Sequence, residues 1–233
     1  MNLTPVREAH ARLDATLSRM TDAEAAGPSR LAGWTRAMVA THLARNADSN
    51  AFMAEAATRG ERRDQYPGGR AERAAGIEAG RGRTAAEVLA DVRAASALWE
   101  GVFARVTDWS FEVPAGVGMR PLSQRVASRL MEVEVHHADL GLGYTFRDWP
   151  PDFAEEQVAR RLRSMREDGE GEPGRWSVGG HVVDLGGGPE GAVDGDPRGL
   201  LAWLMGRETA ESAGLVVCGD ARVASLPAWF PFP

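Results

Sequence analysis

Residues 129–140 read RLMEVEVHHADL, and this stretch decides how the first half of the chain folds. A helix advances by about 100° per residue, so a pattern of apolar residues can be assigned to one face. Five apolar residues in and just before this stretch fall on a single face: Leu122, Val126, Leu130, Val133 and Leu140. We therefore predict a helix over residues 121–142 that packs through this face against other helices.

A neighbouring strip of the same predicted helix carries Glu132, His136 and Asp139, within an arc of about 60°. Side chains at positions i and i+4 point to one place, and a carboxylate with an imidazole is a good ligand pair for a divalent metal such as Zn²⁺. Glu134 and His137 form a rival pair on another part of the helix. Helical geometry alone leaves both pairs open.

A further candidate ligand, His42, lies in the otherwise apolar run of residues 38–44. Alone, such a histidine is more often a buried residue with a hydrogen-bond partner. If its helix faces the Glu132 and His136 pair across a bundle, the three side chains form a set of two histidines and one glutamate with an open position. That set is typical of catalytic metal sites, because structural zinc sites usually have four protein ligands.

Three more helices precede residue 121. The first begins at about Thr4, the second covers residues 36–59, and the third runs from Thr84 to about residue 106. Thr84 and Glu87 form a capping-box pattern at the start of the third helix. Four helices with at least one long connection predict an antiparallel four-helix bundle over residues 1–148.

The pattern changes after Trp149-Pro150-Pro151. A helix at 152–168, a hairpin turning at Gly179-Gly180, a helix that opens at Asp196-Pro197 and a buried strand at 215–218 are predicted there. The predicted fold class is therefore α+β, with a bundle at residues 1–148 and a small α+β domain at 149–233.

The composition of the chain excludes several kinds of binding partner and of chemistry. The 233 residues carry a net charge of −6, and this argues against a nucleic-acid-binding protein. All 27 basic residues are arginine, which excludes lysine Schiff-base chemistry. No apolar run is long enough for a membrane span, and no secretory signal is evident. Cys218 is the single cysteine, so no intramolecular disulfide can form. It lies in an apolar run predicted to be a buried strand, so we expect it to be buried. We expect a cytoplasmic protein, most simply a monomer, that contacts neither nucleic acid nor membranes.

Three segments resemble motifs of the mycothiol-dependent maleylpyruvate isomerase family, which belongs to the DinB-like metalloenzyme superfamily. Gly33-Trp34-Thr35 with THLARNAD at residues 41–48 resembles the first motif, and EVEVHHADLG at 132–141 resembles the second. LLAWLMGR at residues 200–207 resembles a third motif. The resemblance covers nearly the whole chain, and the motifs occur in the matching order.

This resemblance implies a DinB-like bundle that holds a divalent metal, most simply zinc, through His42, Glu132 and His136. The family's Glu-x-x-x-His pattern selects Glu132 with His136 over the rival pair. It also implies that Arg207, from the C-terminal domain, reaches the active site and grips a substrate carboxylate or a developing enolate. Arg222 is a second candidate for gripping the substrate carboxylate or the enolate. Without the resemblance, Arg207 would be assigned to capping a helix end.

The implied activity is the cis-to-trans isomerisation of maleylpyruvate to fumarylpyruvate in gentisate breakdown, a step of aromatic catabolism. Mycothiol is the implied thiol cofactor, and a metal-bound thiolate would add to the alkene. Two alternatives remain open: a mycothiol S-transferase that conjugates an electrophile, and a non-catalytic, metal-stabilised protein that binds a small molecule. Both the isomerase and the S-transferase require a small-molecule substrate and a low-molecular-weight thiol.

Overall fold

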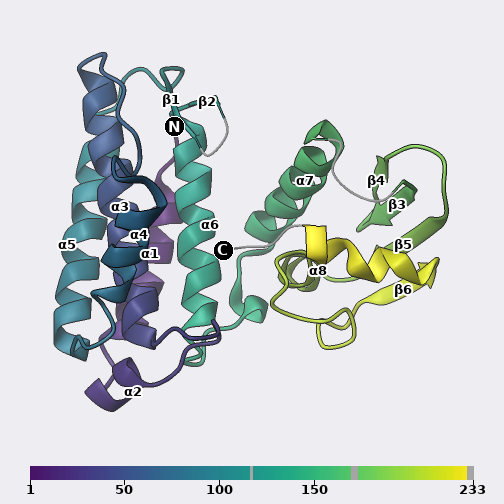
Figure 1. Cartoon of the computed structure of the whole chain (residues 1–233), viewed down its shortest axis with the longest axis horizontal. Helices are drawn as coiled ribbons and strands as arrows, with labels where there is room; N and C mark the ends of the chain where they lie inside the picture. The colour runs from purple at the N-terminus through teal and green to yellow at the C-terminus, as the bar shows by residue number, and fades with distance from the viewer. Residues whose placement is uncertain (116–117, 169–172, 230–233) are drawn as a thin grey trace. The chain divides into compact units, whose positions relative to one another are not determined.

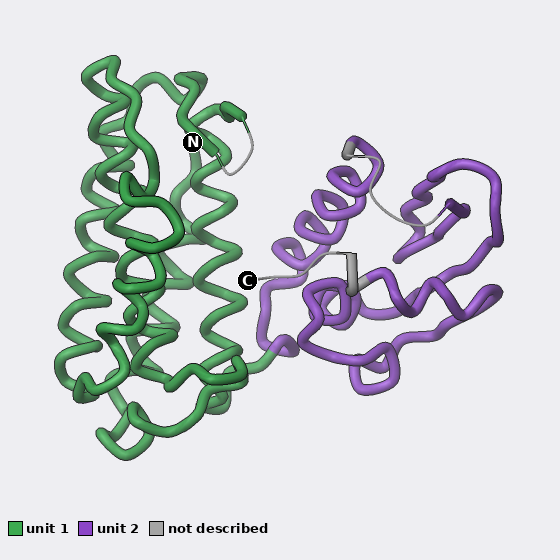
Figure 2. The backbone as a smooth tube through the Cα atoms, in the orientation of Figure 1, with its two compact units in different colours: residues 1–145 green, residues 146–233 purple. Residues whose placement is uncertain are grey.

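The chain forms two compact units, residues 1–145 and 146–233 (Figure 2). The computed structural model describes residues 1–115, 118–168 and 173–229, without the side chains of 168 and 227–229. The first unit is predominantly helical and the second combines helices with a four-stranded sheet. The predicted α+β class is therefore confirmed.

Four long helices build the first unit (Figure 1). They are α1 (Thr4–Leu17), α3 (Arg36–Thr58), α5 (Ala85–Phe103) and α6 (Gln124–Asp139). Helix α1 packs against α5 and α6, and α3 packs against the same two helices. The predicted four-helix bundle is present, and the predicted capping box begins α5, with Thr84 and Glu87 making both of its bonds.

The directions of the helices follow from hydrogen bonds at the two ends of the bundle. At one end, Arg36 Nε donates to the Leu140 carbonyl at 2.7 Å, and the Ala85 N–H donates to Asp22 at 2.8 Å. At the other end, Arg62 Nε donates to the Glu112 carbonyl at 3.4 Å. Helices α3 and α5 therefore run parallel to each other, and α1 and α6 run in the opposite direction. Each helix has one antiparallel and one parallel neighbour.

Several short elements were not expected from the sequence. Helix α2 (Asp22–Ala26) follows α1, and α4 (Gly69–Glu78) lies in the crossover that allows α3 and α5 to run parallel. Strands β1 (Glu112–Pro114) and β2 (Met119–Pro121) form a small hairpin before α6. The N–H groups of residues 122 and 123 donate back to residues 111 and 109, so α6 begins at Gln124 rather than at 121.

Helix α3 is buried on most of its sides, because α4, α5 and α6 pack around it. Its many alanines allow this close approach, but they share the helix with His42, Asn46 and Asn50, all of which are buried. The apolar face predicted for α6 is also in the core, with Leu130 only partly buried. The bundle therefore encloses polar side chains where α3 meets α6.

The second unit contains a sheet of order β4-β3-β5-β6. Its elements are η1 (Phe146–Asp148), α7 (Pro151–Asp168), β3 (Arg175–Val178), β4 (His181–Asp184), β5 (Glu190–Asp194), α8 (Pro197–Leu204), β6 (Val216–Gly219) and η2 (Ala221–Trp229). The hairpin of β3 and β4 is as predicted. Strand β5 was missed; it pairs parallel with β3 and antiparallel with β6.

The prediction that Cys218 is buried is wrong. The residue lies in a strand, as expected, but β6 is an edge strand and all four of its residues are exposed. A short apolar run fits an edge strand as well as a buried one, because the sequence does not reveal which strands have two neighbours. Among the described residues, no helix is long and apolar enough to cross a membrane.

Candidate metal centre

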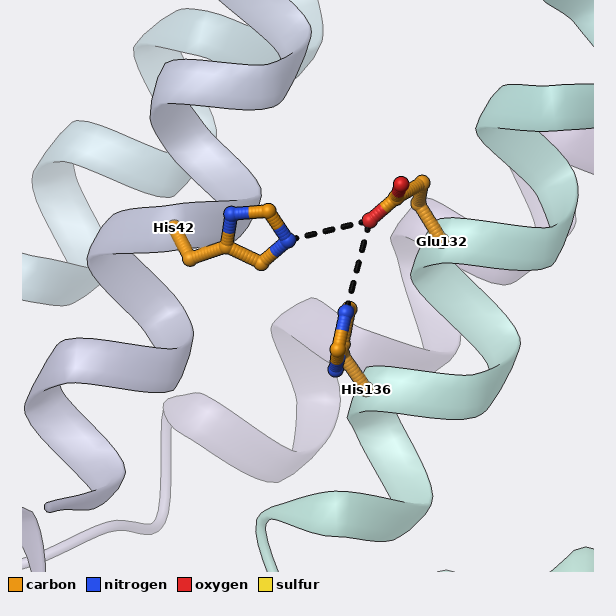
Figure 3. Close-up of side chains that lie close together, drawn as sticks. All are labelled: His42, Glu132 and His136. Atoms are coloured by element: carbon orange, nitrogen blue, oxygen red, sulfur yellow. Dashed lines mark hydrogen bonds and ion pairs between the residues drawn. The ribbon is translucent and has the colours of Figure 1, made fainter. Parts of the chain in front are cut away.

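Three potential metal ligands meet where α3 packs against α6. His42 comes from α3, and Glu132 and His136 come from consecutive turns of α6 (Figure 3). Each offers one ligand atom, and these atoms all lie within 4.8 Å of one another. Among the described residues, this is the one group of three or more histidine, cysteine or acidic side chains arranged in this way.

The distances fit a metal of the size of zinc. His42 Nε2 lies 3.0 Å from Glu132 Oε2, and His136 Nε2 lies 3.4 Å from the same oxygen. Ligand atoms at about 2.0–2.1 Å from a tetrahedral zinc ion are about 3.3 Å apart. Two imidazoles and one carboxylate are also the donor types that zinc and similar divalent ions accept. The residues present therefore fit the metal that the sequence pattern implies, and a set of three protein ligands leaves coordination positions open.

The three groups lie in a poorly solvated place. The side chains of His42 and His136 are 2% and 1% exposed, and that of Glu132 is 22% exposed. Burial lowers the pKa of His42. Burial opposes ionisation of Glu132, but hydrogen bonds with His136 and His42 outweigh it and hold the pKa of Glu132 well below its usual range. The centre therefore presents a carboxylate and a neutral imidazole, the forms that bind metals.

Asp139 fixes the orientation of His136. Its Oδ2 accepts a hydrogen bond from His136 Nδ1 at 2.9 Å, and this leaves Nε2 directed at Glu132. Burial opposes protonation of His136, but Asp139 and Glu132 outweigh it and raise the pKa of the imidazole. A metal at this position would replace a proton on Nε2. A carboxylate behind a histidine ligand in this way is the usual second partner of a metal-bound imidazole.

The rival pair of Glu134 and His137 faces a different part of the bundle. Glu134 accepts hydrogen bonds from Arg12 and from the Tyr144 hydroxyl. The His137 ring stacks on Tyr144 with 3.8 Å between centroids, and its Nε2 lies 2.7 Å from the Thr16 hydroxyl. Both residues therefore bind α1 to α6, and the structure does not bring them to the candidate centre.

Arg207 lies in the second unit, three residues after the last residue of α8, Leu204. Gly206 has φ of 67°, a conformation that favours glycine, and the Arg207 N–H bonds back to the Ala202 carbonyl at 2.9 Å. The Arg207 side chain donates from Nη1 to the Met205 carbonyl at 2.9 Å. The glycine before the arginine thus sets where Arg207 leaves the helix. Arg222 bonds to Asp220 through two nitrogens, at 3.1 and 3.0 Å.

Two residues near the centre had no signal in the sequence. Tyr66 lies in the connection between α3 and α4, and Arg73 lies on α4. Arg73 interacts electrostatically with His42, and Tyr66 interacts with Glu132; burial raises the pKa of the tyrosine. Both belong to the crossover, whose path is set by tertiary packing rather than by any local pattern.

Replacing His42 by alanine should abolish metal binding, because a carboxylate and a single imidazole on one helix remain. Metal content after purification and re-loading with zinc measures this. His181→Ala is the control, since His181 is an exposed residue of the second unit. Full metal content in His42→Ala would exclude His42 as a ligand.

Asp139→Asn should retain the three ligands but weaken metal binding by about ten- to hundred-fold, because the imidazole loses its charged partner. Competition with a chromophoric chelator measures the dissociation constant. Asp14→Asn is a suitable control, because Asp14 forms a surface ion pair with Arg93. Equal affinity of Asp139→Asn and the unmodified protein would refute an orienting role for Asp139.

Comparisons with known proteins agree with the architecture. A family model described as the mycothiol maleylpyruvate isomerase N-terminal domain matches residues 6–141. A crystal structure of the mycothiol-dependent maleylpyruvate isomerase matches with a TM-score of 0.84 and 25% identity, over 94% of this chain and 92% of that chain. A histidine-to-alanine mutant of that isomerase matches with a TM-score of 0.83 at the same identity and coverage.

No curated protein sequence matches the chain. The matched family model spans more than half of the 233 residues and includes nearly the whole bundle, with all three candidate ligands. The chain belongs to the mycothiol maleylpyruvate isomerase family.

Proposed function

We propose that this protein is a metal- and mycothiol-dependent isomerase that converts maleylpyruvate to fumarylpyruvate. The observation that carries the proposal is the convergence of His42, Glu132 and His136 to within 4.8 Å in a member of this family. Three protein ligands leave coordination positions open, as a catalytic metal requires. The matched solved structure, with TM-score 0.84, is that of a mycothiol-dependent maleylpyruvate isomerase.

The bound metal would supply Lewis acidity, which lowers the pKa of a coordinated thiol from its ordinary value of about 8.5 and makes the thiolate available near neutral pH. The residues of the chain keep the site in the right ionisation state. Glu132 is held ionised by its hydrogen bonds, and His42 is kept neutral by burial. The exclusion of water from both histidines strengthens every electrostatic interaction at the centre.

The isomerisation itself needs only a reversible addition. The thiolate sulfur adds to the alkene of maleylpyruvate, and the electron pair moves to the conjugated carbonyl oxygen as an enolate. The former double bond is now single, so it rotates. Collapse of the enolate expels the thiolate and leaves the trans alkene, so thiol and proton balance are unchanged. A fixed guanidinium fork is well suited to an enolate or a carboxylate, and we assign this role to Arg207.

A mycothiol S-transferase remains the second candidate. The family model ends at residue 141, before the whole of the second unit and Arg207. The part that the family model covers contains the candidate metal ligands, which both reactions would use, while Arg207, which we assign to the substrate, lies outside that part. A transferase would use the same addition step but retain the carbon–sulfur bond. The open coordination positions disfavour a purely structural role for the metal.

Incubation of the zinc-loaded protein with maleylpyruvate should give fumarylpyruvate only when mycothiol is added, with the thiol recovered unchanged. Product analysis by NMR together with thiol titration follows both. Stoichiometric consumption of the thiol with a stable adduct would support the transferase instead. Metal binding without any response to thiol or substrate would support the non-catalytic binding protein.

Arg207→Ala should retain the metal but lose at least about a hundred-fold in kcat/KM, because a charge-stabilising donor is typically worth that much. Arg175→Ala is the matched control, since Arg175 is an exposed arginine of the same unit that pairs only loosely with Glu190, at 3.9 Å. Unchanged turnover in Arg207→Ala would remove this residue from the reaction, without affecting the assignment of the metal ligands.

A further inference from the structure

An arginine, Arg129, lies inside the bundle, one turn of α6 before Glu132. Arg129 is only 1% exposed, and it is the largest charged side chain buried in the described part of the first unit. A buried guanidinium is costly unless its donors and its charge are matched. Its contacts therefore indicate what the residue does.

Two of these contacts reach α3 at the turn that carries His42. Arg129 Nη1 donates to the Leu43 carbonyl at 2.8 Å and to Asn46 Oδ1 at 3.0 Å. Leu43 follows His42 directly in the chain, and Asn46 lies one turn further along the same helix. The guanidinium thus joins the His42 turn of α3 to the Glu132 turn of α6.

The other hydrogen bond of the guanidinium is with His10 of α1. Arg129 Nε donates to His10 Nε2 at 3.1 Å, and His10 Nδ1 lies 2.8 Å from Glu100 Oε1. Burial lowers the pKa of His10 to about 2, so the imidazole is neutral. A neutral imidazole accepts at one nitrogen and donates from the other, which fits these two bonds. His10 belongs to α1 and Glu100 to α5, so all four long helices contribute to the position of Arg129.

This arrangement is a poor one if fold stability is all that Arg129 provides. Its Nη2 has no hydrogen-bond partner among the described residues. Burial lowers the pKa of the guanidinium to about 10, which reflects the cost of burying its charge. A well-packed apolar side chain of similar length often serves stability equally well or better. What an apolar side chain cannot do is fix two backbones through directional bonds.

We propose that Arg129 is a positioning residue of the metal centre. It sets the spacing and register of α3 against α6, so that His42 Nε2 and Glu132 Oε2 meet at 3.0 Å. Metal ligands need placement to within about 0.5 Å, and directional hydrogen bonds between helices constrain their register in a way that non-directional apolar contacts do not. The inference rests on the metal centre proposed above, and it adds a residue that neither binds metal nor contacts a ligand side chain through a hydrogen bond.

The test compares Arg129→Met with the unmodified protein and with Arg125→Met. Arg125 lies on the same helix, one turn earlier, and donates to the Pro114 carbonyl rather than to α3. Three quantities are measured: the zinc dissociation constant by chelator competition, the visible spectrum of the cobalt-loaded protein, and the thermal unfolding midpoint of the metal-free protein.

Arg129→Met should bind zinc about ten- to hundred-fold more weakly and change the cobalt spectrum, while the unfolding midpoint of the metal-free protein stays within a few degrees. Arg125→Met should leave zinc affinity and the cobalt spectrum unchanged. Arg129→Lys keeps the charge but lacks the fork, so its zinc affinity should also fall. Unchanged zinc affinity and cobalt spectrum in Arg129→Met would overturn the proposal, as would full affinity in Arg129→Lys.

If Arg129→Met does not fold, Asn46→Ala and His10→Phe provide the answer, because each removes one partner of the guanidinium and keeps its charge. The proposal requires weaker zinc binding in both, and unmodified affinity in both would overturn it. Absence of zinc binding by the unmodified protein would instead refute the metal centre itself, so the two failures are distinguishable.

Discussion

The structure of the first unit depends on one constraint: α3 is buried on most of its sides, yet it carries polar side chains into the interior. Buried polar groups are costly unless they are paired. His42 is paired with Glu132, and Asn46 with Arg129, so the polar residues of α3 and α6 must face each other in one register. A slip of one residue would leave several of them without partners. The convergence of the three candidate ligands follows from this register.

Helix α6 carries two pairs of glutamate and histidine on different faces. Glu132 and His136 face α3, whereas Glu134 and His137 face α1, where Arg12 and Thr16 supply partners. The surroundings then give each set a different use. Glu134 pairs with the guanidinium of Arg12, whereas the side-chain hydrogen bonds of Glu132 in the described part of the chain are with His42 and His136. A carboxylate whose hydrogen-bond partners are imidazoles forms a set of ligands that a divalent metal accepts.

The two units contribute differently to the proposed activity. All three candidate metal ligands and their supporting residues belong to the first unit, which is also the part that the family model covers. The second unit carries Arg207, to which we assign the substrate-binding role, directly after the positive-φ Gly206 that follows α8. We infer that metal chemistry is built into the bundle and that substrate recognition draws on the second unit. Changes in the second unit could then alter the substrate without disturbing the metal.

The sequence by itself determined the elements that have a strong local signal. The periodicity of residues 121–142 predicts a helix, the Thr84 and Glu87 pattern predicts the start of α5, and Gly179-Gly180 predicts a hairpin. All three are present. The resemblance further selected Glu132 and His136. These features depend on residues close together in the chain, where spacing alone fixes geometry.

Only the tertiary structure decided the rest. The parallel course of α3 and α5, the hairpin before α6, the parallel pairing of β5 and the exposure of Cys218 each depend on which distant segments become neighbours. The same holds for Arg129, which is one arginine among many in the sequence. Its burial, and the bonds that join it to α1 and α3, exist because the helices enclose it. Local patterns carry no record of such long-range contacts, since their free energy arises only when the chain has folded.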